Sequence, residues 1–163
     1  MDMKLATRIN SLLPLFGDDV REVLANLRRI GLTHVDLNYP EHSRDIEAGQ
    51  MRQVLADCRL EANGVALRFR SERYLNGEFG NADPAIATEA LQLCKDACDY
   101  CRAIGGRVVT IWLGFDGFDY PFQIAYARVW EQQRKVFQTI CDYAPDLQVS
   151  IEYKNLADRK SVV

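Results

Sequence analysis

The chain has 163 residues, the size of one domain, and its 48% hydrophobic and 26% charged residues are ordinary for a globular protein. Its net charge of −3, with no run of basic residues, argues against a surface that binds nucleic acid. The sequence does not open on a signal peptide, and no stretch approaches the roughly 18 apolar residues of a membrane span, so we expect a cytoplasmic protein with no membrane partner.

Apolar segments that suit strands alternate along the chain with amphipathic segments that suit helices. The strand-like segments cover residues 5–13, 33–37, 64–69, 108–113 and 149–153. The helical segments run from the capping residue Asp18 or Asp19 to Gly31, from about 44 to 60, from 83 to 104 and from 121 to 143. Two of the connections that follow strands are long and contain glycine, at 70–82 and 114–120.

Strands that alternate with helices predict parallel pairing with right-handed crossovers. Strands that are apolar throughout indicate a sheet buried on both faces, either an open doubly wound sheet or a closed barrel. No G-x-G-x-x-G motif follows the first strand, which disfavours the dinucleotide-binding version of the open sheet. A barrel keeps its chemistry in the loops after its strands, where the long loops of this chain lie. The sequence therefore predicts an α/β fold, a partial (β/α)8 TIM barrel with about strands 1–5 and helices 1–4.

The five cysteines fit a reducing compartment. Cys98 and Cys101 have the C-x-x-C spacing of metal and redox sites, but Cys94, Cys98 and Cys101 also lie at i, i+4 and i+7 of a predicted helix. That spacing places the three thiols on one helix face, where a free cysteine behaves as a small buried hydrophobe. We therefore interpret them as core residues.

Glu152-Tyr153-Lys154 closes the last predicted strand. Since side chains alternate along a strand, Glu152 and Lys154 point to the same face. There the carboxylate would hold a divalent cation and the ammonium would stabilise an oxyanion, as suits a metal-dependent sugar site. The alternative is an ion pair on the surface of a strand, which is the commoner role of such a pair.

Further candidates for substrate binding lie near the ends of other strands. Trp112 precedes an aromatic loop with glycine hinges, which would either line a sugar pocket or pack beneath the next helix. His42 follows the second strand, on the functional side of a barrel, whereas His34 falls within that strand and suits packing. Arg68 and Arg70 end the third strand, where they would either bind an anion or form a solvated loop.

From Leu5 to Lys154 the chain resembles the xylose isomerase-like TIM barrels, the sugar isomerase/epimerase superfamily. In xylose isomerases the fifth strand ends in Glu-Pro-Lys-Pro-Asn-Glu-Pro-Arg, and Glu152 and Lys154 match its first and third positions. The resemblance implies that Glu152 binds a divalent metal. It also implies that Lys154 assists hydrogen transfer at the substrate oxygens.

Three more positions follow from the same resemblance. Trp112 looks like the tryptophan of the family's Trp-Gly-Gly segment. Phe69 looks like the phenylalanine that walls the substrate pocket, because residues 77–83 repeat the Gly-x-Phe then Asp pattern of the loop that follows it. Xylose isomerases carry a histidine linked to ring opening at the end of strand two, and here that place is Asn38. The chain therefore looks closer to the branch that includes rhamnose-type isomerases.

The match stops after Lys154, where the family would continue with three more strand–helix units and the remaining metal ligands. Residues 158–163 read as the translation of a common sequencing-adapter sequence in one frame. We therefore expect residues 1–157 to be the N-terminal half of a xylose isomerase-like barrel, which typically needs about 250 residues. We expect 158–163 to be a non-native tail, and a natural short C-terminus is the alternative.

Together these features predict a metal-dependent isomerase or epimerase of a sugar or sugar phosphate, with Mn²⁺ or Mg²⁺ as cofactor and Co²⁺ as a further candidate. The predicted catalytic residue is Lys154 and the predicted metal ligand is Glu152. The predicted substrate contacts are Trp112, Phe69, Asn38 and His42. The expected partner is a small-molecule sugar, and the complete protein is expected to be a homo-oligomer.

We expect the chain alone to be inactive, because a usable metal site needs several ligands. Two alternatives stay open at this point. One is a non-catalytic truncated fragment. The other is a barrel related to the metal-dependent endonucleases for abasic DNA, although the acidic net charge and the two histidines disfavour it.

Overall fold

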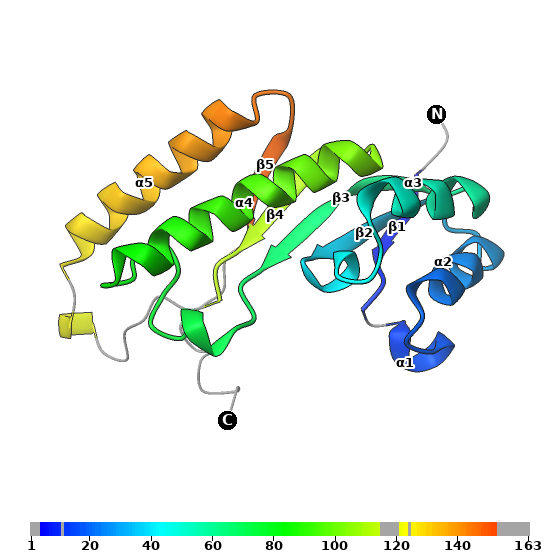
Figure 1. Ribbon diagram of the computed structural model, residues 1–163, viewed down its shortest axis with the longest axis horizontal. Helices are drawn as coiled ribbons and strands as arrows, with labels where there is room; N and C mark the ends of the chain where they lie inside the picture. Colours follow the sequence, from blue (N-terminus) through cyan, green and yellow to red (C-terminus); the bar gives the residue numbers. More distant parts are fainter. Residues whose placement is uncertain (1–3, 11, 115–120, 124, 153–163) are drawn as a thin grey trace.

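The computed structural model describes residues 4–10, 12–114, 121–123 and 125–152. Among these residues, five parallel strands form one sheet, and their spatial order is their order in the sequence (Figure 1). A doubly wound sheet reverses its strand order near the middle, so the sequential order identifies the partial barrel. The strands are β1 (Ala6–Arg8), β2 (His34–Tyr39), β3 (Glu61–Arg68), β4 (Val108–Trp112) and β5 (Gln148–Glu152).

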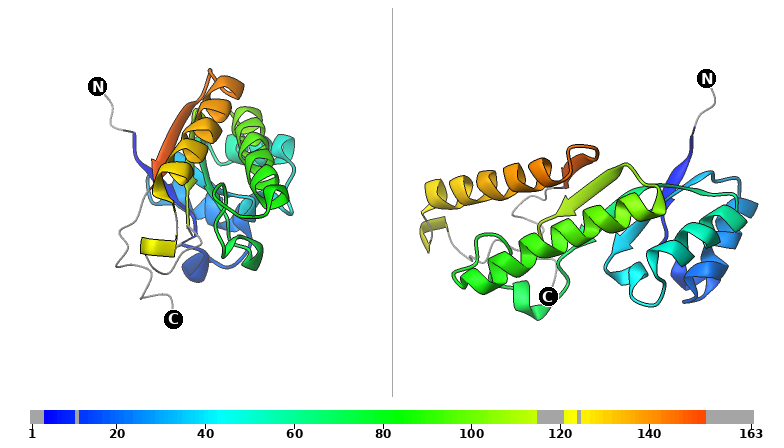
Figure 2. Two further views of the ribbon diagram at one scale, coloured as in Figure 1. Left: turned by 90° about the vertical axis from the view of Figure 1, so that its left-hand side faces the viewer. Right: turned by 45° about the horizontal axis from the view of Figure 1, so that its top comes forward.

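Helices connect the strands and lie along one side of the sheet (Figure 2). The longer ones are α2 (Val20–Arg29), α3 (Ala48–Asp57), α4 (Pro84–Ile104) and α5 (Tyr126–Tyr143). The short ones are α1 (Leu13–Phe16), η1 (Glu41–Ser43), η2 (Glu72–Tyr74) and η3 (Pro121–Gln123). Neighbouring long helices contact one another in sequence order, because right-handed crossovers that add strands in one direction keep their helices on one face. Within the described residues, no helix is long and apolar enough to cross a membrane.

Alternation along the strands gives the sheet two different faces. The face beneath the helices carries apolar side chains that are almost completely buried, namely Val35, Leu37, Val65, Leu67, Val109 and Ile111. The opposite, inner face carries small or polar residues at the intervening positions, namely Asp36, Asn38, Gly64, Ala66, Thr110 and Ser150. The apolar core therefore lies between the sheet and the helices, and the inner face is left for polar groups.

The ends of the predicted helices are confirmed where capping residues mark them. The Asp83 side chain accepts a hydrogen bond from the Ala85 backbone N–H at 2.9 Å, with Pro84 in the first turn of α4. The same helix ends at Gly105, whose φ of 86° is the left-handed conformation that glycine adopts without strain. In α2 the capping residue is Asp19, which accepts from the Arg21 N–H at 2.8 Å.

Other predicted boundaries were wrong. The first strand was expected to cover 5–13, but β1 ends at Arg8 and α1 begins at Leu13. The spacing of apolar residues in so short a segment suits a helical turn as well as a strand. The second strand was expected at 33–37, but β2 continues to Tyr39. Tyr39 is held there by packing against Tyr100 of α4, with the ring centroids 5.4 Å apart.

The cysteines of α4 are core residues, as predicted. Cys94, Cys98 and Cys101 are all fully buried. Burial is the main reason that the pKa of the Cys98 thiol is raised to about 11 and that of Cys101 to about 12. These thiols therefore stay protonated near neutral pH and pack as apolar groups.

Gly64 gives a test of the sheet geometry. A Cβ at this position would lie 2.9 Å from the Val108 carbonyl carbon and closer still to its oxygen, and backbone atoms cannot move aside cheaply. We expect Gly64→Ala to lower the free energy of unfolding by roughly 3 kcal/mol, as for overpacking in a core. Gly49 of α3 is the control, because nothing lies within 4 Å of its Cβ position. Gly49→Ala should be neutral or stabilise by up to about 1 kcal/mol in urea unfolding. Equal stability of the two variants would contradict this geometry.

Candidate active site

The residues that end β3, β4 and β5 form one row across the inner face. Arg68, Trp112 and Glu152 are register partners, so they lie side by side at the carboxyl edge of the sheet. The Arg68 guanidinium lies over the Trp112 ring with its Cζ 5.3 Å from the ring centroid, which is a cation–π contact. The structure thus brings together Glu152 and Trp112, two of the residues that the sequence singled out.

Arg8 joins this row from the far edge of the sheet. Its Nη2 donates to Glu152 Oε2 at 2.8 Å, although Arg8 ends β1 and Glu152 ends β5. A contact between the first and last strands across the inner face requires the sheet to curve with that face concave. Arg8 is not among the predicted site residues, because the predicted first strand extends to residue 13 and has Arg8 in its interior. Its position as the last residue of a shorter strand is the signal that would have found it.

Asn38 is fully buried on the inner face, at the end of β2. Its Nδ2 donates to Glu41 Oε2 at 2.8 Å, and its backbone N–H donates to His42 Nδ1 at 2.9 Å. Its Oδ1 is buried and accepts no hydrogen bond from any described residue. A buried carbonyl oxygen without a donor costs about 1–3 kcal/mol, which makes this oxygen a candidate acceptor for a bound molecule. The role of Asn38 as a substrate contact stays a prediction.

His42 supports the end of β2 from η1. The side chain is 6% exposed, and burial is the main cause that lowers its pKa to about 4. The positive charges of Arg68 and Arg70 lower the pKa further, while Glu41 opposes them. The imidazole is therefore neutral near pH 7, as it must be for Nδ1 to accept from the backbone N–H. Its role as a substrate contact stays a prediction.

Phe69 lies in the core rather than beside Trp112. It is two residues after Leu67, so alternation places it on the helix-covered face, where it is 1% exposed. Its ring centroid lies 5.2 Å from that of Tyr74 and 5.7 Å from that of Phe79, and both contacts are edge-on. Phe79 in turn contacts Phe137 of α5. The assignment of Phe69 as a pocket wall stays a prediction.

Glu78 is a buried carboxylate that the sequence reasoning did not single out. It lies in the loop after β3, is 2% exposed, and its Oε1 accepts a hydrogen bond from the Gly114 N–H at 3.0 Å. This bond ties the loop after β3 to the end of β4, beside the Trp112 ring. The Gly-x-Phe pattern around Glu78 was noticed only as a family signature, and nothing in it indicated burial.

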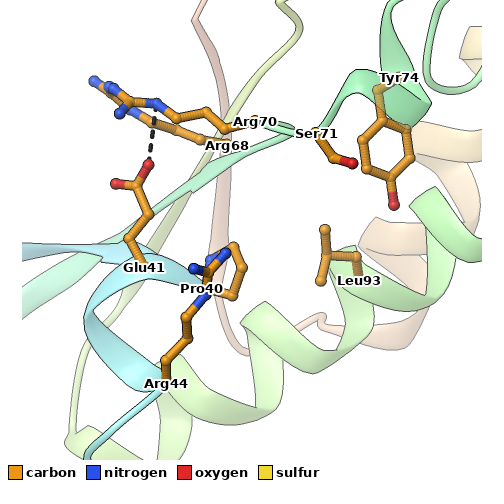
Figure 3. A pocket seen from close by; sticks show the side chains of 8 residues that line it. All are labelled: Pro40, Glu41, Arg44, Arg68, Arg70, Ser71, Tyr74 and Leu93. Atoms are coloured by element: carbon orange, nitrogen blue, oxygen red, sulfur yellow. Dashed lines mark ion pairs between the residues drawn. The ribbon is translucent and has the colours of Figure 1, made fainter.

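A hollow of about 290 Å³ opens beside this row, between the ends of β2 and β3 and helix α4 (Figure 3). Its charged side chains are Glu41, Arg44, Arg68 and Arg70, and the others are Pro40, Ser71, Tyr74 and Leu93. Arg70 forms an ion pair with Glu41, with Nε 3.0 Å from Oε1. Glu41 therefore binds the arginine with one carboxylate oxygen and Asn38 with the other.

Two parts of the predicted site lie outside the described residues, namely Lys154 and the aromatic loop at 115–120. Glu152 offers one carboxylate, the kind of oxygen ligand that a hard divalent cation prefers. In the described part of the chain, no group of three or more His, Cys, Asp or Glu side chains could hold a metal ion. Glu152 is thus a fitting first ligand, and the described residues do not complete a metal centre around it.

A family model for the xylose isomerase-like TIM barrel matches residues 7–162 of the chain. A curated relative, the xylose isomerase of Dinoroseobacter shibae, is 29% identical over 80 residues, which is 49% of this chain and 18% of that protein. The solved structure of an L-ribulose 3-epimerase matches with a TM-score of 0.70 at 18% identity and covers 94% of this chain. A structure of the IolI protein with a bound zinc atom matches with a TM-score of 0.66 at 14% identity and covers 91% of this chain.

The chain spans about half of the solved structures that it resembles, 50% of the epimerase and 51% of IolI. At these identities the structural likeness establishes the fold. The five sequential parallel strands therefore correspond to part of a TIM barrel, as the sequence predicted.

The buried neutral His42 predicts a dependence of stability on pH. An unfolded histidine titrates near 6.5, whereas folded His42 titrates near 4, so between these values the unfolded state binds more protons. The stability contributed by His42 is complete above about pH 6.5 and is lost as the pH falls toward 4, by up to about 3 kcal/mol. Urea unfolding of wild type and His42→Gln at several pH values should show a shallower loss in the variant. Parallel pH profiles would contradict the assignment.

Proposed function

The chain belongs to the xylose isomerase-like TIM barrel family, and on this basis we propose that it acts in a metal-dependent isomerase or epimerase of a sugar or sugar phosphate. The observation that carries the proposal is the row of Arg68, Trp112 and Glu152 at the carboxyl edge of the inner face. Active sites of TIM barrels lie at this edge of the strands. The acidic net charge of −3 disfavours a nucleic-acid substrate for the same fold.

The residues of the row suit a polyhydroxylated substrate. The Trp112 ring offers a flat apolar surface, on which the ring or chain of a sugar can rest while water is excluded. Asn38 Oδ1, buried and without a donor in the described structure, would accept one sugar hydroxyl. Arg68 would donate to another oxygen, since its Nε is also buried and has no described acceptor.

The proposed reaction moves a hydrogen between adjacent carbons of the sugar, by proton transfer through an enediolate or by a hydride shift. Negative charge then develops on a substrate oxygen, and Lys154, two residues after Glu152, is the proposed group that stabilises it. A bound divalent cation would supply polarisation of the substrate oxygens. Glu152 would be one of its ligands, with Mn²⁺ or Mg²⁺ as the favoured ion. The zinc atom in the IolI structure supports a divalent metal in this family.

Arg8 has a defined part in this proposal. Its guanidinium neutralises the Glu152 carboxylate at 2.8 Å, so a cation that binds Glu152 must displace it. The ion pair thereby keeps the carboxylate oriented in the absence of metal. Removing Arg8 should free Glu152 for a cation, and removing Glu152 should leave a cationic patch that repels one.

The first experiment tests the reaction itself. A barrel that contains this chain and the remaining strands is incubated with Mn²⁺ and ketohexoses in D₂O. We expect interconversion of sugars, and deuterium at the epimerised carbon if a proton is exchanged through an enediolate. Conversion without deuterium would point to a hydride shift. The absence of any conversion across aldoses, ketoses and their phosphates would overturn the proposal in favour of a non-catalytic chain.

The second experiment tests the assigned residues in that barrel. Glu152→Gln keeps the shape but removes the charge that a hard cation requires, so Mn²⁺ affinity and turnover should fall together. Lys154→Met should spare metal binding and slow turnover about 100-fold, since one oxyanion-stabilising group is worth roughly 3 kcal/mol. Mn²⁺ binding is measured by electron paramagnetic resonance. Glu131→Gln on the exposed face of α5 is the matched control. Full metal-dependent activity of Glu152→Gln would show that Glu152 serves only as the structural partner of Arg8.

A further inference from the structure

The hollow beside the inner-face row is strongly cationic for its size. Of the eight residues that line it, three are arginines and one is a glutamate, which leaves an excess of two positive charges. Figure 3 shows Arg68 and Arg70 above Glu41 and Arg44 below it, with Tyr74 and Leu93 across from them. A volume of about 290 Å³ is at the lower end for small-molecule sites, which fits a compact ligand.

Protein groups do not satisfy these arginines. Arg70 is paired with Glu41, but that carboxylate is shared with Asn38 Nδ2. Arg68 Nε is buried and donates to no acceptor among the described residues. Arg44 is exposed and forms no hydrogen bond or ion pair with the described part of the chain, and Glu41 is the acidic side chain among the residues that line the hollow.

This crowding is unfavourable without an anion. Burial, and next the neighbouring charges of Arg70 and Arg8, lower the pKa of the Arg68 guanidinium, while Glu41 and Glu152 raise it. A dianion placed between the arginines would reverse that repulsion and accept the unused N–H donors. Guanidinium groups present several donors in a planar fork, which matches the oxygens of phosphate better than any other cationic side chain does.

The remaining wall of the hollow is neutral and well held. Pro40 and Leu93 contribute apolar surface, and the Tyr74 ring stands beside them. Its hydroxyl donates to Glu89 Oε1 at 2.9 Å, which fixes the ring. This arrangement suits an organic phosphate, because its phosphate group would contact the arginines and its carbon skeleton would contact the neutral side chains.

We infer that Arg44, Arg68 and Arg70 form an oxyanion subsite that binds the phosphate group of a phosphorylated sugar. Arg68 connects this subsite to the row, because its guanidinium lies over Trp112, the register partner of Glu152. A phosphate in the hollow therefore leaves the sugar carbons able to reach Trp112 and Asn38. The inference that the phosphate belongs to a sugar substrate rests on the proposed function. The inference that the hollow binds phosphate does not depend on it.

The test begins with inorganic phosphate and the ¹⁵N-labelled chain in the absence of metal. Titration should shift the backbone signals of residues that line the hollow, such as Ser71, in a saturable way. Arg44→Gln and Arg70→Gln should each weaken phosphate binding about tenfold, the loss of one charge-assisted hydrogen bond. Arg52→Gln, which removes the same charge from an exposed position on α3, should leave the affinity unchanged.

Glu41→Gln gives the sharpest discrimination. The amide keeps an oxygen that can accept from Asn38 Nδ2, but it removes the negative charge and releases Arg70. Phosphate should then bind several-fold more tightly than to the wild type. If Glu41 and the arginines have only a structural role, Glu41→Gln should not increase the affinity for phosphate. Unchanged or weaker phosphate binding by Glu41→Gln, or equal binding by the Arg44→Gln and Arg52→Gln variants, would overturn the subsite.

The substrate assignment is tested by comparing D-fructose 6-phosphate with D-fructose. We expect the phosphorylated sugar to bind at least tenfold more tightly, and this advantage should disappear in Arg44→Gln. Equal binding of the two sugars would overturn the phosphate subsite even if both were interconverted in the completed barrel. Preserved phosphate binding without any sugar interconversion would instead reject the proposed function and leave the oxyanion site standing.

Discussion

The alternation of side chains along five parallel strands is the constraint on which the other features of this molecule depend. One set of positions is apolar and lies beneath the helices, where Leu37, Leu67 and Ile111 are fully buried. The other set must then face the opposite side, and there the chain has small and polar residues. Because strands are added in one direction, helices cover only one face. The fold thereby separates the apolar core, on the helix side, from the polar groups of the inner face.

The curvature of the sheet turns this inner face into a site. Arg8 and Glu152 are 144 residues apart in sequence and end opposite edge strands, yet they form an ion pair at 2.8 Å. Both side chains are about one-third exposed, so the energy of the pair is screened by solvent and is modest. Its importance lies in geometry, because it gathers the carboxyl ends of the strands around one space. A flat sheet with the same strands would hold the two residues far apart.

The polar groups of that space are out of balance in charge. Around the hollow, Arg44, Arg68 and Arg70 outnumber Glu41, although the chain as a whole is acidic. Neutral supports such as His42 and Asn38 hold the backbone without adding negative charge. Neighbouring positive charges beside a single carboxylate repel one another. This is the arrangement expected where an oxygen-rich, anionic small molecule supplies the missing acceptors.

The sequence by itself determined most of the helices and strands, that α4 begins after Asp83 and ends at Gly105, and that the cysteines of α4 pack in the core. These features depend on local rules, on capping, periodicity and the size of side chains. It also located Glu152 and Trp112 at strand ends. Only the tertiary structure decided the meeting of Arg8 with Glu152 and the hollow shared by Glu41 and the arginines. Periodicity states which face a residue occupies, but the curvature of a sheet and the approach of its edges depend on packing between elements far apart in the chain.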